Sequence, residues 1–249
     1  MFLDHVTFAL GDLDDAVERV EHSLGVRFET PTNTIPGITG RVAVLDSGFI
    51  EVMAVHDREE AQRAPFGQKF VDYVDSRGGG IFSVTLRTEE DLSSFKSGLP
   101  EGVRNCGPIT TWVPQPDGTR INFSSLFFGQ YHLTPWVIAY DGELPKVPGD
   151  LALRGICLNA SDLQSEVDRY AELYRVPQDR ITVGSREAVM ELSDGFIRMR
   201  QGDPVGFSSV EIAGPGTTFS IGFSGSEIQV MRNSTGDHES NEPQTNGSA

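Results

Sequence analysis

A six-residue phrase occurs twice in this chain, and its repetition constrains the fold more than any other feature. Gly48-Phe49-Ile50-Glu51-Val52-Met53 recurs as Gly195-Phe196-Ile197-Arg198-Met199-Arg200. Related sequence precedes each copy, because residues 3–13 have their counterpart in residues 153–163. In this pairing His5 corresponds to Gly155 and Glu51 to Arg198, and a guanidinium cannot ligate a metal. The chain therefore contains a duplicated small unit, and at most one copy keeps a candidate site.

Hydrophobic periodicity predicts the order of elements within the first unit. Val6 to Leu10 alternate as in a strand, and apolar residues between 13 and 24 recur at helical spacing. Asp12 is a good N-cap for this helix and Gly25 a good stop. Two strands joined by a turn follow at 41–45 and 49–55, with room for another short strand at 26–30. The predicted unit is strand, helix, strand, strand.

The same pattern returns three more times. A helical segment at 57–76, broken at Pro65, precedes a second unit whose helix we expect to be capped by Thr88. Strands of this unit are predicted near residues 82–87, 119–126 and 136–140, whereas residues 103–116 show no readable pattern. A third unit spans 153–200. The fourth lacks its helix, because Gly214-Pro215-Gly216 turns directly into the next strand.

These units predict an α+β fold in which repeated βαβββ modules form curved mixed sheets. We expect residues 1–142 to form one domain of two modules and residues 151–232 a second, degenerate half. Residues 142–150, rich in proline and glycine, predict a linker between them. Residues 233–249 are polar apart from the final alanine, which predicts a disordered tail.

Charge narrows the classes of partner. Acidic residues outnumber basic ones 36 to 20, and only three of the basic residues are lysine, which is typical of a surface adapted to high salt. Without a basic stripe, nucleic acid is excluded as a partner. No apolar run is long enough to cross a bilayer, so we expect a soluble, cytoplasmic protein without a membrane partner. Cys106 and Cys157 lie far apart and predict two buried thiols.

The order and spacing of several motifs resemble a known family. They are Leu3-Asp4-His5-Val6, Asp12-Leu13-Asp14, the phrase from Gly48 to Val55, Leu86-Arg87-Thr88, Pro116-Asp117-Gly118-Thr119 and Pro135-Trp136-Val137-Ile138. Over residues 2–142 the chain resembles the vicinal oxygen chelate superfamily, and most closely its glyoxalase-like domain family. The resemblance implies two modules curled around a cavity, with a divalent metal (Zn, Mn, Ni or Fe) that binds adjacent substrate oxygens.

Carrying the family's ligands over residue by residue gives an incomplete set. His5 and Glu51 match the pair of the first module. In the second module the histidine position falls at Ser83 or Val84, and the glutamate position at Ala139. His132 is the candidate third ligand, which would give two histidines and a carboxylate. Each has a structural alternative: His5 as a core histidine, Glu51 on the solvent face and His132 as a cap of a surface turn.

Two functions stay open at this stage. The first is a divalent-metal-assisted lyase, isomerase or dioxygenase on a small oxygenated substrate, in which His5, Glu51 and His132 hold the metal and Tyr140 or Ser83 orients the substrate. The alternative is a metal-free small-molecule binding protein of the same fold with a degenerate site. The second half is expected to support the first or to form a homodimer surface. A purely structural role is the third interpretation.

Overall fold

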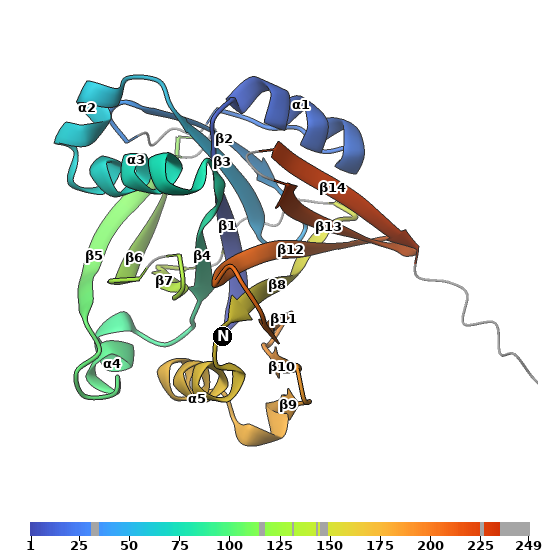
Figure 1. Ribbon diagram of the computed structural model, residues 1–249. Helices are drawn as coiled ribbons and strands as arrows, with labels where there is room; N and C mark the ends of the chain where they lie inside the picture. The colour runs from blue at the N-terminus through green and yellow to red at the C-terminus, as the bar shows by residue number, and fades with distance from the viewer. Residues whose placement is uncertain are drawn as a thin grey trace, which may run out of the picture.

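Two curved sheets make up the fold (Figure 1). The computed structural model describes residues 1–30, 35–114, 118–130, 132–142, 144, 149–224 and 227–234, and within them the strands form two seven-stranded sheets. In spatial order the first contains β2 (Ile38–Val44), β3 (Phe49–Val55), β1 (Phe2–Leu10), β4 (Gly80–Arg87), β7 (Trp136–Tyr140), β6 (Arg120–Phe128) and β5 (Asn105–Pro114). The second contains β14 (Glu227–Ser234), β13 (Thr217–Ser224), β12 (Gly206–Gly214), β8 (Ala152–Ala160), β11 (Phe196–Gln201), β10 (Glu187–Glu191) and β9 (Ile181–Val183).

The strand pairing confirms the predicted fold class. β1 pairs in parallel with β3 and antiparallel with β4, so the first two modules join edge to edge. β8 repeats this arrangement with β11 and β12. A parallel pair needs a crossover connection, which α1 (Leu13–Leu24) and α5 (Leu163–Tyr174) supply. The last module has no such helix, and β12 and β13 form a hairpin at the predicted glycine–proline turn.

Local sequence explains where the helices begin and end. The Asp12 side chain accepts the first free N–H groups of α1, and Gly25 ends this helix in the left-handed conformation at φ 70°. Pro65 separates α2 (Arg58–Arg63) from α3 (Pro65–Arg77), because proline fits the first turn of a helix but not its interior. The expected cap at Thr88 was wrong: α4 (Leu92–Ser97) begins after Asp91, whose carboxylate accepts two backbone N–H groups. A 3₁₀ turn at Gln178–Arg180 precedes β9.

The two faces of the first sheet are covered differently. Its outer face shares one hydrophobic core with the second sheet and with α1, α4 and α5. On the opposite side, which we call the inner face, α3 packs over the end of the sheet at which β1 finishes, through Phe70, Val71 and Tyr73. Ala9 and Met53 lie beneath this helix. Phe2 and Phe49, at the starts of β1 and β3, do not belong to this cluster.

The repeated phrase has a packing reason. A Cβ on Gly48 would lie 2.8 Å from the Asp4 carbonyl oxygen and 3.0 Å from Leu153 Cβ. A Cβ on Gly195 would lie 2.3 Å from the Arg154 carbonyl oxygen and 2.8 Å from Leu3 Cδ1. Each glycine thus lets its own first strand, and the leucine of the other half, approach closely. The contact is reciprocal, so the duplication is visible in three dimensions.

Several details differ from the sequence prediction. β5 was missed: it is an edge strand exposed on both faces, so no alternation marks it, and Gly107-Pro108 interrupts its pairing. Cys106 lies on this strand and is exposed, contrary to prediction, whereas Cys157 is buried. Residues 26–30 contribute only a bridge between Glu29 and Val42.

The expected linker and tail fall partly or mainly outside the described residues. In the linker, only residues 142, 144, 149 and 150 are described. The expected disordered tail began too early, because residues 233 and 234 complete β14; residues 235–249 lie outside the described part of the chain. None of the helices in the described part is long and apolar enough to cross a membrane.

Candidate active site on the inner face

Strand register places the predicted polar residues of the first module on one surface. His5 lies between Phe49 on β3 and Thr85 on β4, and the next inward position of β1, Thr7, lies between Glu51 and Ser83. Because side chains two residues apart on a strand share a face, all six point to the inner face. Of the two alternatives for the second module, Ser83 lies on this face opposite Thr7, whereas Val84 belongs to the shared core.

A hydrogen-bonded chain holds His5. The Asp4 carboxylate lies 2.6 Å from His5 Nδ1, and the Tyr140 hydroxyl donates to the same carboxylate oxygen over 3.1 Å. On the other side of the ring, Nε2 lies 3.0 Å from the Thr85 hydroxyl oxygen. Asp4 is only 4% exposed, so it is a buried carboxylate whose partners are a phenol and an imidazole. This chain fixes the imidazole at both nitrogens.

Tyr140 acts in this chain as a hydrogen-bond donor. Burial raises the pKa of its phenol well above the ordinary value, and the neighbouring Asp4 charge raises this pKa further. The phenol therefore keeps its proton at neutral pH. It reaches Asp4 on β1 from β7, two positions away in the sheet order, so both modules build the site.

Glu51 and Phe49 complete the wall beside His5. The Thr7 hydroxyl donates to Glu51 Oε2 over 2.8 Å. This hydrogen bond gives a polar partner to a carboxylate that lies within an apolar strand. The His5 ring stacks on Phe49, with 4.3 Å between ring centroids and 15° between planes. The His5 side chain keeps 14% of its surface exposed, so solvent reaches its edge.

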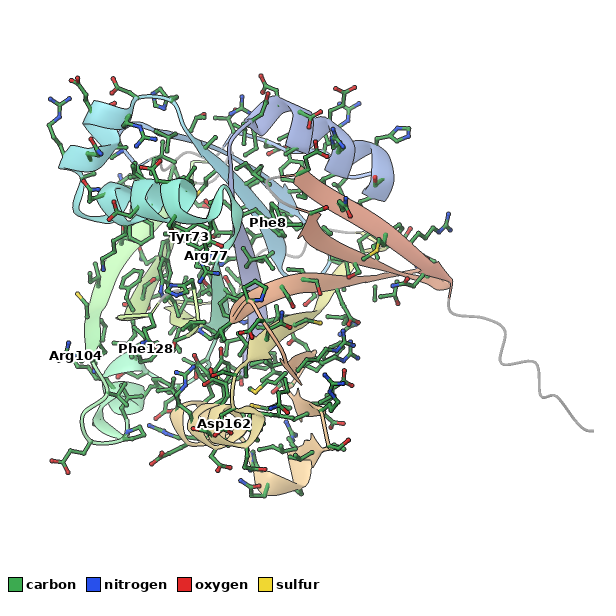
Figure 2. The ribbon with its side chains drawn as sticks, viewed as in Figure 1. Phe8, Tyr73, Arg77, Arg104, Phe128 and Asp162 are labelled. Atoms are coloured by element: carbon green, nitrogen blue, oxygen red, sulfur yellow. The ribbon has the colours of Figure 1, made fainter. Side chains whose placement is uncertain are left out.

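His132 lies elsewhere. Its ring centroid is 6.5 Å from that of Tyr73 on α3, and the guanidinium carbon of Arg77, labelled beside Tyr73 in Figure 2, lies 5.7 Å from the centre of the same tyrosine ring. The Tyr73 hydroxyl donates to the Ile81 carbonyl, four residues before Thr85 on β4, which is about 13 Å along an extended strand. Desolvation lowers the pKa of His132, and the Arg77 charge lowers it further. The structure therefore does not bring His132 to His5 and Glu51.

The donor set on the inner face falls short of a metal centre. Among the described residues, no three His, Cys, Asp or Glu side chains cluster as metal ligands. The residue assigned to the glutamate position of the second module is Ala139, which has no ligating atom in its side chain and packs against the outer core. His5 and Glu51 alone leave a site one ligand below the usual three of catalytic zinc. The residues present do not fit the metal that the family resemblance implies.

Sequence reasoning missed Asp4 and Thr85. In a regular strand, adjacent residues point to opposite faces, so the sequence did not predict a hydrogen bond between the side chains of Asp4 and His5. The β1–β4 register shifts between Leu3 and His5, and this irregularity lets Asp4 reach the ring of its neighbour. The signal available was an Asp-His pair within an apolar strand.

Two surface hollows lie away from this site. One, of about 480 Å³, is lined by residues 161–164, 183–185 and 201 of the second half. The other, of about 570 Å³, is lined by residues 35–39 with His56 and Glu60. Neither hollow is lined by His5, Asp4 or Tyr140. The candidate site is therefore identified from the hydrogen bonds of these residues and not from a surface hollow.

Paired βαβββ-like modules joined through their first strands define the vicinal oxygen chelate class of fold. The chain belongs to the glyoxalase-like domain family: the model of that family matches residues 3–174. The match extends beyond the sequence resemblance at 2–142 and includes β8 and α5. A search of curated proteins found no match.

One solved structure shares the fold over both halves of the chain. A hypothetical protein from Staphylococcus aureus superposes with a TM-score of 0.72 at 15% identity, covering 92% of this chain and 97% of its own. The arrangement of both halves is thus shared with that protein. Methylmalonyl-CoA epimerase from Mycobacterium tuberculosis matches with a TM-score of 0.39 at 23% identity, over 56% of this chain and 86% of its own.

Proposed function

We propose that this protein binds a small oxygenated molecule on the inner face of the first sheet and that His5 transfers a proton to or from it. The observation that carries the proposal is the buried Asp4 carboxylate at His5 Nδ1. A base oriented by a second group is the usual arrangement for proton transfer in enzymes. The proposal needs no metal.

The hydrogen-bond chain selects one tautomer of neutral His5. An ionised carboxylate only accepts hydrogen bonds, so Asp4 holds the proton on Nδ1. Nε2 then carries the lone pair and accepts from the Thr85 hydroxyl. A hydroxyl group rotates at little cost, so an acidic C–H or O–H group of a bound molecule can take its place. Nε2 is the atom that receives the proton.

Other polar groups of the face bind and orient the substrate in this proposal. The hydrogen bond from Thr7 uses one oxygen of Glu51, and the other oxygen accepts from a hydroxyl group of the ligand. Ser83 is 1% exposed and lies opposite Thr7, so it packs beside the Thr7 and Glu51 end of the face. Tyr140 acts through Asp4, since its hydroxyl donates to that carboxylate. It is a positioning residue.

Hydrogen–deuterium exchange tests this proposal without knowledge of the complete reaction. The protein is incubated in D₂O with small carbonyl compounds, and NMR follows the loss of their α-protons. We expect exchange that falls by about 100-fold or more in His5→Gln, because general-base catalysis contributes on that order. Asp4→Asn should also slow it, while His22→Gln, an exposed histidine on α1, is the matched control.

Two other outcomes would replace the proposal. About one equivalent of divalent metal, lost together with exchange in both His5→Ala and Glu51→Ala, would support the metal-assisted lyase, isomerase or dioxygenase instead. Ligand binding with no exchange that depends on His5 would support the metal-free binding protein. Elemental analysis of the untagged protein therefore accompanies the assay.

A further inference from the structure

Arg87 presents an unsatisfied donor beside the proposed site. It follows Thr85 by two positions on β4, so it shares the inner face, and it pairs with Phe2 on β1 and Ile138 on β7. Its guanidinium carbon lies 4.8 Å from the centre of the Phe2 ring. Its Nε is buried and has no hydrogen-bond partner.

The missing ion-pair partner sets Arg87 apart from Arg198, the other described arginine whose buried Nε lacks a hydrogen-bond partner. Buried donors are normally satisfied, and leaving one unpaired costs about 1–3 kcal/mol. In the described part of the chain, three buried side-chain nitrogens lack a partner: Arg87 Nε, Trp136 Nε1 and Arg198 Nε. Arg198 nevertheless forms ion pairs with Glu211 and Glu187. For Arg87, no carboxylate of the described residues lies within ion-pair distance.

The second orphan donor lies on the same face. Trp136 pairs with Thr85, the residue bonded to His5, so Trp136 and Arg87 occupy neighbouring positions of the inner face, both on the β4–β7 side of the proposed base. Positions two residues apart on a strand are about 7 Å apart. An uncharged donor suits a neutral oxygen, whereas a guanidinium suits a carboxylate, to which it donates two parallel hydrogen bonds.

We infer that the ligand of the inner face is a small carboxylic acid with a second oxygen, whose carboxylate is bound by Arg87. This inference rests on the proposed function and specifies its substrate class. The second oxygen accepts from Trp136, and the carbon between the two oxygens lies over His5 Nε2. An arginine without a carboxylate partner, in a protein of net charge −16, favours an anionic ligand over a neutral one.

Mandelate and its uncharged amide, mandelamide, test the inference, because they differ only in the charged group. Calorimetry should show that the wild-type protein binds mandelate at least about tenfold more tightly, the order of a charge-assisted hydrogen bond. Arg87→Gln should reduce this preference to near unity. Arg87→Lys keeps the charge but not the fork, so it should retain only part of the preference.

Arg120→Gln is the matched control. Arg120 also lies over an aromatic ring on this sheet, 4.0 Å from the centre of Trp112. Strand alternation places its neighbour Ile121, and not Arg120, on the same face as Phe123. This variant should keep the wild-type preference. Equal binding or no binding of the two probes by the wild-type protein, or an unchanged preference in Arg87→Gln, would overturn the inference.

The readouts separate this inference from the proposed function. His5→Gln should abolish deuterium exchange and leave the preference for mandelate in place. A preference that follows Arg87 without any exchange that depends on His5 would support the carboxylate site and refute the proton transfer. Exchange that depends on His5 without a preference that follows Arg87 would do the reverse.

Discussion

The corresponding faces of the two sheets can be compared position by position, because β1 and β8 pair with their neighbours in the same register. His5 lies between Phe49 and Thr85, and Gly155 lies between Phe196 and Glu211. Thr7 lies between Glu51 and Ser83, as Cys157 lies between Arg198 and Ser209. The backbones are thus duplicated, and the difference lies in the side chains.

In the second sheet the charges neutralise one another. Arg198 forms ion pairs with Glu211 and Glu187, and the Cys157 thiol lies 3.7 Å from Glu211. A Cβ on Gly155 would meet the Phe196 ring at 2.4 Å, so that ring fills the space that corresponds to the His5 side chain. The first sheet instead stacks Phe49 on His5 and aligns the ring with Asp4. A duplicated backbone keeps its fold when one copy loses its reactive groups.

The largest effect should come from breaking the contact that both copies share. Gly195→Ala places a methyl group 2.3 Å from the Arg154 carbonyl oxygen, and we expect it to lower the free energy of unfolding by about 2–3 kcal/mol. Gly48→Ala should cost a similar amount, since the φ of 77° adds backbone strain. Urea denaturation measures both.

Gly202→Ala is the control for these two variants. Nothing lies within 4 Å of a Cβ at Gly202, so the midpoint should stay near that of the wild type. Wild-type stability in both Gly48→Ala and Gly195→Ala would mean that the reciprocal contact does not hold the halves together.

A smaller effect should distinguish the closed face from the open one. Arg198 and Glu211 are 24% and 19% exposed, so Arg198→Met leaves a largely buried carboxylate unpaired and should cost about 2 kcal/mol. The double variant Arg198→Met/Glu211→Leu should recover most of that loss, because two apolar side chains replace the pair. A double-mutant cycle in urea gives the coupling energy.

The corresponding change in the first sheet is Glu51→Gln. The Thr7 hydroxyl can still donate to the amide oxygen, so we expect a loss of about 1 kcal/mol or less. If Glu51→Gln costs as much as Arg198→Met, the two faces do not differ in the way that the ion pairs indicate.

The smallest effect concerns pH at the junction of the halves, where the carbonyl of His132 lies near Gly206. The pKa of His132 is lower in the folded chain than in the unfolded chain, so the unfolded chain binds the proton more readily. Stability should therefore fall as the pH drops below the ordinary histidine pKa of about 6.5, until the lower folded pKa is passed. His132→Gln should make this decline shallower, as urea denaturation between pH 7 and pH 5 would show.

His22→Gln is the matched histidine variant, on the exposed face of α1. A decline in stability that is unchanged in His132→Gln would mean that other groups at the junction carry the acid sensitivity.

The sequence alone determined the modular fold. Strand and helix periods, the caps at Asp12 and Gly25, and the repeated phrase at Gly48 and Gly195 are local signals, because backbone conformation and burial act on neighbouring residues. The same alternation left open whether Glu51 faces the solvent and whether Ser83 or Val84 belongs to the site, and the strand register places His5, Glu51 and Ser83 on one face. The edge strand β5 lacked this signal, since both of its faces are exposed.

Only the tertiary structure decided which groups act together. Asp4 reaches His5 through an irregularity in β1, Tyr140 reaches Asp4 across the sheet, and the ring of His132 lies beside Tyr73 of α3. These contacts depend on strand order and on distances between residues more than 100 positions apart, which no local pattern encodes. The sequence therefore placed residues on strands and faces, and the pairing of those strands selected the chemistry, because hydrogen bonds require atoms about 3 Å apart.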